Sequence, residues 1–309
     1  MEKVSIVTAF FDLNRGGWAS STIGRNDYLN HFAFWAKLRN HVVVYTDSNM
    51  ASQVRKVRER YGLLDLTNII VVDDYSKLDT ELLQSIKFAM HRKNVREFHL
   101  KPNNPESWSP EYNYVMLLKS WCVCDAIKKG LVDGMVAWLD FGFNKNGALY
   151  IDSDDFDFEW KINLSNKVHY FTVNKMDDIA IYEIIQRMDT YIQGGSFIAP
   201  ATIWPHLWDL MRSSMFELNS CGLCDDDQVL MLMAYRKEPD LFEIHQCQWF
   251  GMFDVTTPGH FKLRSFVPPA KNLRGFFKRI RLKVKTKRQL LSYLFRQYQI
   301  LSKRNTLND

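Results

Sequence analysis

Residues 131–147 read LVDGMVAWLDFGFNKNG, and this stretch decides the fold class. An apolar run over residues 135–139 stops at a single carboxylate, Asp140, which is followed by Gly142 and a polar turn. That pattern is typical of a central strand in an α/β sheet that carries an acid to the ligand crevice beyond its carboxyl end. An acid in that crevice can hold a divalent cation against a diphosphate. A strand that ends at a solvated Asp is the alternative, and these residues alone favour neither interpretation.

Strand and helix patterns alternate on both sides of this stretch. Strands are predicted at residues 4–10, 41–45, 68–72, 168–173, 191–198 and 241–245. Helices are predicted at residues 26–38, 51–62, 112–129, 204–216 and 226–235. Regular alternation predicts an α/β fold with a mostly parallel central sheet flanked by helices. We expect one domain over residues 1–265 and a separate tail over residues 266–309.

The composition indicates a folded protein from a reducing compartment. The chain has 309 residues, of which 46% are hydrophobic and 14% aromatic, which is enough for a full globular core. Five cysteines, an odd number, fit reducing conditions. The first residues, MEKVSIVTAFF, enter a strand without a signal-peptide pattern, and no apolar run approaches the roughly 20 residues that span a bilayer. We therefore expect a cytoplasmic protein.

The basic residues of the chain concentrate in the tail. Residues 271–304 contain twelve Lys or Arg and no acid, whereas residues 1–270 contain 28 basic and 34 acidic residues, a net charge of −6. Apolar residues spaced for one helical face follow at Leu290, Leu291, Leu294, Phe295, Tyr298 and Leu301. Basic amphipathic segments bind anionic membrane surfaces, so we predict a basic helical C-terminal tail that binds the inner face of the cell membrane peripherally. Nucleic acid is disfavoured by the acidic body, and packing of the helix back on the domain is the remaining alternative.

Several polar and glycine residues could serve a site at the carboxyl ends of the strands. Gly194 and Gly195 allow a ligand to approach the backbone, or they form a tight turn or bulge. One acid of residues 225–227 can cap the helix that follows, and another can accept a proton from a sugar hydroxyl or orient it. Lys119 lies in an apolar helical stretch and either reaches phosphate or extends to solvent. His245 ends a strand and is either structural or a metal ligand.

Eight motifs along the chain carry a resemblance to a known family. They are VTAFFDLNRGGW (residues 7–18), RNDYLNHFAFW (25–35), VVVYTD (42–47), the helix at 114–119, WLDFG (138–142), QGGSF (193–197), the Asp-Gln pair at 227–228 and LFEIHQCQW (241–249). Together they resemble the HtrL/YibB (WlaTB-like) bacterial glycosyltransferase family over roughly residues 3–255. The resemblance implies a GT-A fold, the fold of nucleotide-diphospho-sugar transferases. It also implies a role in the assembly of bacterial surface polysaccharide, such as lipopolysaccharide, O-antigen or capsule.

On this resemblance we predict a donor site at the carboxyl ends of the first, second and fourth strands. Its residues are Thr8, Ala9, Phe10, Arg25, Asp47 and Lys119. The first three line the base and ribose, and Asp47 receives a hydrogen bond from either group. Arg25 and Lys119 face the phosphates, because an electropositive lining compensates a partly desolvated dianion. UDP is favoured because it is the commonest donor nucleotide in similar folds.

A divalent cation, Mn²⁺ or Mg²⁺, is predicted on the diphosphate of the donor. Asp140 is its expected ligand. GT-A enzymes generally use an Asp-x-Asp motif, but here Gly142 takes the place of the second acid. Another ligand must then come from elsewhere in the chain, and His245 is the expected one.

The predicted reaction is transfer of a sugar, expected to be a hexose, to a hydroxyl of a lipid-linked saccharide acceptor. Asp227 is the expected base if the reaction inverts the anomeric centre, and it positions the donor sugar if the reaction retains it. Gly194, Gly195 and Trp249 are expected to border the sugars, since glycine admits close approach and an indole offers a flat apolar face.

Two other functions fit the same residues less well. The chain could be a non-catalytic protein that binds a glycan or a nucleotide-sugar on this fold, which the missing second Asp supports. It could also be a phosphatase with Asp140 as the nucleophile, but the phosphatase Asp-x-Asp motif requires an acid at position 142, where this chain has Gly142.

Overall fold

The computed structural model describes residues 1–18, 24–92, 95–265 and 291 of the chain. Apart from residue 291, the tail predicted over residues 266–309 lies outside these residues, so its helix and its membrane contact stay predictions. None of the helices in the described part of the chain is both long and apolar enough to cross a bilayer.

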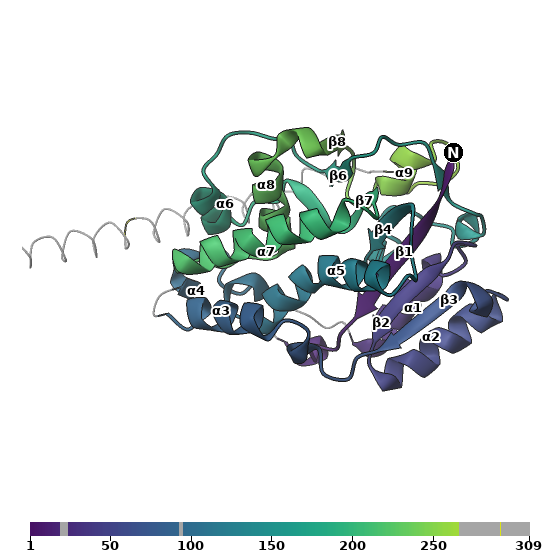
Figure 1. The fold of residues 1–309 in the computed structure, drawn as a ribbon, viewed down its shortest axis with the longest axis horizontal. Coiled ribbons are helices and arrows are strands. Elements are labelled where there is room, and N and C mark those ends of the chain that lie inside the picture. Colours follow the sequence, from purple (N-terminus) through teal and green to yellow (C-terminus); the bar gives the residue numbers. More distant parts are fainter. Residues whose placement is uncertain (19–23, 93–94, 266–290, 292–309) are drawn as a thin grey trace, which may run out of the picture. The chain divides into compact units, whose positions relative to one another are not determined.

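One central sheet with the order β3-β2-β1-β4-β7-β6-β8 organises residues Met1–Arg264 (Figure 1). Its strands are β1 (Glu2–Phe10), β2 (Val42–Thr46), β3 (Thr67–Val71), β4 (Met135–Leu139), β6 (Val168–Thr172), β7 (Ile192–Pro200) and β8 (Phe242–Gln246). The short β5 (Lys161–Ile162) pairs antiparallel with the start of β1. Of the other strands, only β7 runs antiparallel to its neighbours, β4 and β6. The sheet is therefore mostly parallel, as predicted.

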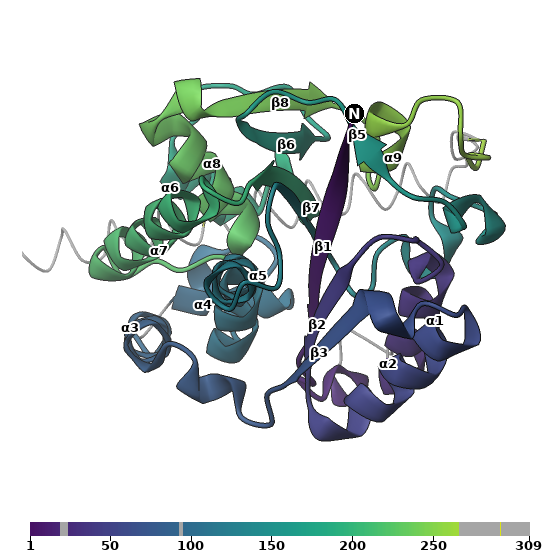
Figure 2. The same ribbon diagram turned by 45° about the vertical axis from the view of Figure 1, so that its right-hand side comes forward.

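Helices cover both faces of this sheet (Figure 2). On one face pack α3 (Thr80–Met90), α5 (Pro110–Lys128), α7 (Trp204–Ser220) and α8 (Asp227–Lys237). On the other pack α1 (Arg25–Trp35), α2 (Ser48–Arg60) and α9 (Met252–Thr256). The remaining short helices are α4 (Val95–Phe98) and α6 (Ile181–Arg187). This arrangement confirms the α/β fold class that the alternation of patterns predicts.

The strands consist of long apolar runs because helices cover both faces of the sheet. In β1, Val7 faces the core under α5 while Ile6 faces the core under α1, and both side chains are fully buried. β2 and β4 are buried along their whole length. A central parallel strand of this kind has no solvent face that would require polar residues. β4 contains no polar residue, and the first polar side chain after it is that of Asp140.

Candidate active site

A cavity of about 500 Å³ opens at the carboxyl ends of β1 and β4. Its wall includes nine of the twelve residues predicted for the site: Ala9, Phe10, Arg25, Lys119, Asp140, Gly194, Gly195, Asp227 and Trp249. The ends of parallel strands meet at one edge of the sheet, which is where ligands bind in α/β folds. The antiparallel β7 contributes its amino-terminal half to the same edge, because its Ser196 pairs with Leu139 at the end of β4.

Lys119 joins the two acids of the cavity. Its Nζ lies 2.8 Å from Asp227 Oδ2 and 3.1 Å from Asp140 Oδ1, and it donates a 2.8 Å hydrogen bond to the carbonyl of Gly194. The lysine is 5% exposed. Burial acts to lower the pKa of Lys119, but the charges of Asp140 and Asp227 outweigh it and raise that pKa. The ammonium of Lys119, which was predicted to face the phosphates, is therefore paired with acids of the protein itself.

One carboxylate oxygen of Asp140 is available to bind a ligand. Its Oδ1 accepts a 2.8 Å hydrogen bond from the indole of Trp138 in addition to the Lys119 contact. Its backbone N–H donates to the carbonyl of Gly195 at 2.8 Å, which fixes the residue at the end of β4. Within the described residues, Oδ2 accepts no hydrogen bond, and the side chain is 36% exposed. Oδ2 is thus the atom through which Asp140 can bind a ligand or a cation.

The glycine pair makes room for the two acids. A Cβ on Gly194 would lie 2.4 Å from Asp227 Oδ2, and one on Gly195 would lie 3.4 Å from Asp140 Oδ2. The register between β6 and β7 shifts between Tyr170 and Thr172, opposite these glycines, so the pair lies in a bulge. Both glycines line the cavity, but the close approach that they permit is first of all that of the carboxylates.

The three acids Asp225, Asp226 and Asp227 are buried together at the start of α8. Asp226 is the N-cap and accepts a 3.1 Å hydrogen bond from the backbone N–H of Gln228. Burial raises the pKa of Asp225 to about 8, and it also raises the pKa of Asp226 well above its usual range. Burial also raises the pKa of Asp227, although Lys119 opposes this shift. Asp227 is the member that contacts Lys119, and it lines the cavity together with Asp226.

Two cations of the cavity wall were not identified from the sequence, Arg15 and Lys145. Arg15 donates a 2.8 Å hydrogen bond to the hydroxyl of Tyr28, and its guanidinium lies over the ring of Tyr112. Burial lowers the pKa of Lys145, and the charge of Arg15 lowers it further. Within the described part of the chain, neither cation forms an ion pair with an acid. Two neighbouring cations that form no ion pair there provide a place for an anion.

Arg25 also lines the cavity, but its charge is compensated. It lies 2.8 Å from Asp12 and 3.1 Å from Asp47. Asp47 in turn accepts a 2.9 Å hydrogen bond from the backbone N–H of Met50 and so caps α2. Asp47 is not part of the cavity wall, and neither is Thr8, which is fully buried within β1. These two residues, predicted to bind the donor, therefore do not line the cavity.

The structure does not bring His245 to Asp140. β7 and β6 separate β8 from β4, which at the usual strand spacing of about 4.8 Å amounts to about 14 Å. His245 contacts His169 instead, with 2.9 Å between their ring nitrogens. The prediction that His245 and Asp140 hold the same ion was therefore wrong. Strand order, which cannot be read from the order of the elements along the chain, separates β8 from β4.

Comparison with known proteins places the chain in a family. Residues 2–257 match the family described as "Bacterial protein of unknown function (HtrL_YibB)". The chain is 30% identical over 272 residues to Protein HtrL of Escherichia coli (strain K12), which covers 81% of this chain and 90% of that protein.

Three solved structures match the chain weakly. Mouse xyloside xylosyltransferase 1 in its apo form is 12% identical, with 84% of this chain and 94% of that chain covered and a TM-score of 0.41. The PaToxG glycosyltransferase is 14% identical, with 77% and 71% covered and a TM-score of 0.33. Mannose-1-phosphate geranyltransferase from Thermus thermophilus is 11% identical, with 81% and 75% covered and a TM-score of 0.33. Likenesses as weak as these identify no activity.

The family match extends from the first strand to the last helix of the described domain, and the Escherichia coli relative is covered over nearly its whole length. The chain belongs to the HtrL/YibB family.

Proposed function

We propose that the chain is a glycosyltransferase that moves a sugar, expected to be a hexose, from a nucleotide-diphospho-sugar to a hydroxyl of a saccharide. The observation that carries this proposal is the composition of one cavity. It combines Arg15 and Lys145, which form no ion pair within the described residues, with the acid pair Asp140 and Asp227 and with the exposed indole of Trp249. A volume of about 500 Å³ is in the range of sites for small molecules.

The donor is proposed to bind along the β1 side of the cavity. Ala9 and Phe10 at the end of β1, with Arg25 beside them, receive the nucleotide, and UDP is the favoured one. Arg15 and Lys145 receive the diphosphate, because charge-assisted hydrogen bonds offset the loss of its hydration. Asp140 Oδ2 could hold a Mg²⁺ or Mn²⁺ ion, which would supply further positive charge to the diphosphate, since such ions are often bound through one carboxylate and the phosphates of a substrate.

Sugar transfer is proposed to take place between the acid pair and Trp249. The acceptor oxygen forms a bond to the anomeric carbon, while the bond from that carbon to the diphosphate breaks and the nucleotide leaves. In an inverting reaction, Asp227 takes the hydroxyl proton, and its raised pKa suits a base. In a retaining reaction, Asp227 orients the donor sugar. The anomeric configuration of the product, read by NMR, distinguishes the two roles.

A thermal-shift titration with UDP, GDP, CDP and CMP, with and without Mn²⁺, tests the donor site. We expect UDP to raise the melting temperature. Arg15→Gln and Lys145→Gln should each weaken UDP binding about 10- to 100-fold, the usual effect of losing a charge-assisted hydrogen bond. Lys161→Gln is the matched control, because Lys161 pairs with Glu159 and is not part of the cavity wall. If no nucleotide stabilises the protein, the transferase proposal fails.

A non-catalytic protein that binds a nucleotide-sugar is the second candidate. The observation in its favour is that Lys119 contacts both acids of the cavity, while Gly142 leaves Asp140 without a partner acid. Donor hydrolysis separates the candidates, because many transferases slowly release the nucleotide from their own donor. Release by the wild type that is lost in Asp227→Asn supports the enzyme, and binding without any release supports the second candidate.

The acceptor is proposed to be a lipid-linked glycan at the inner face of the cell membrane, used to build bacterial surface polysaccharide. The family resemblance and the basic composition of residues 271–304 support this part of the proposal. Twelve cations without an acid are attracted to anionic lipids by about 1 kcal/mol for each Lys or Arg near the surface. Such a tail would hold the cavity near a membrane-bound acceptor without inserting a helix across the bilayer.

A further inference from the structure

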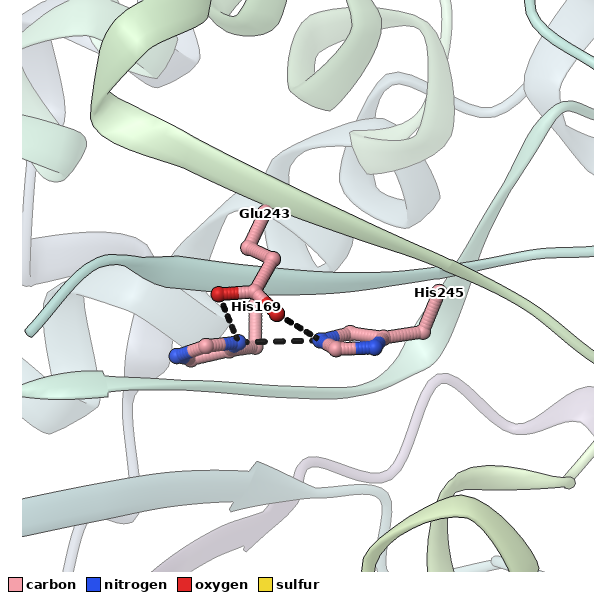
Figure 3. Close-up of side chains that lie close together, drawn as sticks. All are labelled: His169, Glu243 and His245. Carbon is pink, nitrogen blue, oxygen red and sulfur yellow. Dashed lines mark hydrogen bonds and ion pairs between the residues drawn. The ribbon is translucent and has the colours of Figure 1, made fainter. Parts of the chain in front are cut away.

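Three side chains at the outer edge of the sheet converge outside the cavity: His169 of β6 and Glu243 and His245 of β8 (Figure 3). His169 Nδ1 lies 2.9 Å from His245 Nε2 and 3.9 Å from Glu243 Oε2, while His245 Nε2 lies 3.9 Å from Glu243 Oε1. The two strands run parallel, and His169 pairs in register with Glu243. Alternate residues of a strand point to the same face, so Glu243 and His245 both meet His169.

The hydrogen bonds around these three residues orient them toward a common point. His169 Nε2 lies 2.8 Å from the carbonyl oxygen of Ser165, which can only accept, so Nε2 carries the proton and Nδ1 presents its lone pair to His245. The hydroxyl of Ser165 donates a 2.7 Å hydrogen bond to Glu243 Oε2. The ring of Phe171 stacks on His245 at 5.4 Å, which restrains the rotation of that imidazole. Metal-binding histidines usually donate their second nitrogen in this way.

We infer that His169, Glu243 and His245 form a binding site for one Zn²⁺ ion, separate from the cavity that contains Asp140. Two imidazole nitrogens and a carboxylate oxygen are a ligand set of zinc. Tetrahedral zinc with ligands about 2.1 Å away requires about 3.4 Å between ligand atoms. The nitrogens must therefore separate, and the carboxylate must approach, by about half an ångström. His245 must also carry its proton on Nδ1, so that Nε2 can bind the ion.

The position of the site indicates a structural role for the ion. β8 is the outermost strand on its side of the sheet, and β6 is its neighbour there. An ion held by both strands links the edge of the sheet to its interior. His169 is fully buried, while the side chain of Glu243 is 45% exposed, so the ion enters from the Glu243 side and keeps a water there as its fourth ligand. Zinc therefore stabilises the edge of the sheet in this proposal and takes no part in sugar transfer.

Titration of the full, chelator-treated chain with Zn²⁺ and with Co²⁺ tests the site. We expect the visible absorption of four-coordinate Co²⁺ at one equivalent, its displacement by Zn²⁺ and a melting temperature that rises with Zn²⁺. His245→Ala and Glu243→Gln should remove the absorption band and the zinc-dependent stabilisation. Ser165→Ala should weaken zinc binding about tenfold, as loss of a hydrogen bond to a ligand usually does.

His206→Ala is the matched control, because His206 forms an ordinary surface pair with Glu238 at 2.8 Å. This variant and Asp140→Asn should both retain the Co²⁺ band. Glu243→Gln changes a half-exposed side chain, so it remains informative if His245→Ala fails to fold. A band that persists in Glu243→Gln and His245→Ala, or a wild type that shows neither band nor stabilisation, overturns the proposal.

Discussion

Lys119 shows how a single residue can set the electrostatics of the cavity. A lone ammonium buried on α5 would lose its proton, but two carboxylates and a carbonyl keep this one charged. Lys119 also holds Asp140 and Asp227 close to one nitrogen atom. The positive charge that a phosphate would require must then come from Arg15 and Lys145, which have no acid partner in the described part of the chain.

Gly194→Ala is expected to inactivate the protein without unfolding it. The new methyl group would lie 2.4 Å from Asp227 Oδ2, so the carboxylate must move away from Lys119. Overpacking of this kind costs about 1–3 kcal/mol of the free energy of unfolding. Displacement of a catalytic group by about 1 Å can lower turnover about 100-fold.

Turnover and thermal unfolding measure these two effects of Gly194→Ala. Gly17→Ala is the control, since a methyl group there meets no atom of the described residues within 4 Å. Wild-type turnover in Gly194→Ala would show that the position of Asp227 is not critical.

Asp225→Asn is expected to change how the free energy of unfolding depends on pH. Burial raises the pKa of Asp225 to about 8, whereas an unfolded Asp has a pKa near 3.9. Between these values the folded state binds more protons than the unfolded state, so rising pH destabilises the wild type by up to about 1.4 kcal/mol per pH unit. Asn cannot ionise, and its Oδ1 can still accept the backbone hydrogen bond of Asp226.

Denaturant unfolding at pH 5 and at pH 8 tests this expectation. The free energy of unfolding of Asp225→Asn minus that of the wild type should be larger at pH 8 than at pH 5. Asp209→Asn, at an exposed position, is the control. An Asp225→Asn curve parallel to that of the wild type would mean that Asp225 is ionised in the folded protein.

The sequence predicts part of the candidate site, and the limit lies in the contacts between distant residues. A carboxylate directly after a buried strand predicts the place of Asp140, because strand ends meet at one edge of an α/β sheet. The contacts of Lys119 cannot be predicted from such a local pattern, since its partners Asp140 and Asp227 lie on separate elements. Arg15 was missed for the same reason, because its importance depends on contacts with distant residues, among which the described part of the chain includes no ion-pair partner. The prediction that His245 lies near Asp140 was wrong, because it depended on a strand order that the sequence does not reveal.

At the scale of elements, boundaries differ from the prediction where capping and register decide them. α2 begins at Ser48 rather than at residue 51, because Asp47 caps it. β7 continues to Pro200, two residues beyond the predicted end, since it pairs with the full length of β4. α1 ends at Trp35, three residues before the predicted end. Strands buried on both faces were correctly placed, because an uninterrupted apolar run is a local signal.

Asp47→Ala is expected to destabilise the protein by about 1 kcal/mol, the usual loss when a helix N-cap is removed. Asp47→Asn should lose much less, because Asn is also a good N-cap. UDP binding should change little in either variant, since Asp47 does not line the cavity. Thermal unfolding with and without UDP measures both quantities. If Asn destabilises as much as Ala, the ion pair with Arg25 matters more than the cap, and a large loss of UDP binding would restore Asp47 to the donor site.

At the scale of the whole molecule, charge divides the chain into two parts. Residues 1–270 carry a net charge of −6, whereas residues 271–304 carry twelve cations and no acid. An acidic body is repelled by an anionic leaflet, so any attraction must come from the tail. The sequence indicates this division, but the contact that the tail makes depends on a membrane or another partner rather than on the fold.

Truncation after Pro269 is expected to abolish binding to anionic vesicles. Full-length chain should co-sediment with vesicles that contain phosphatidylserine, and the binding should weaken with salt because the Debye length is about 8 Å at physiological ionic strength. Neutral vesicles are the control and should bind neither chain. If the two chains bind anionic vesicles equally, or if neither binds, the tail has another role, such as contact between copies of the protein.

The contact between Gly194 and Asp227 also links the evolution of two positions 33 residues apart in sequence. No side chain fits at position 194 while the carboxylate of Asp227 stays against the backbone, so a mutation at either position changes which residues are tolerated at the other. We expect relatives that keep the acid to keep the glycine. Relatives that have lost the acid can then have larger residues at position 194. In those relatives the cavity lacks the carboxylate that the proposed sugar transfer requires.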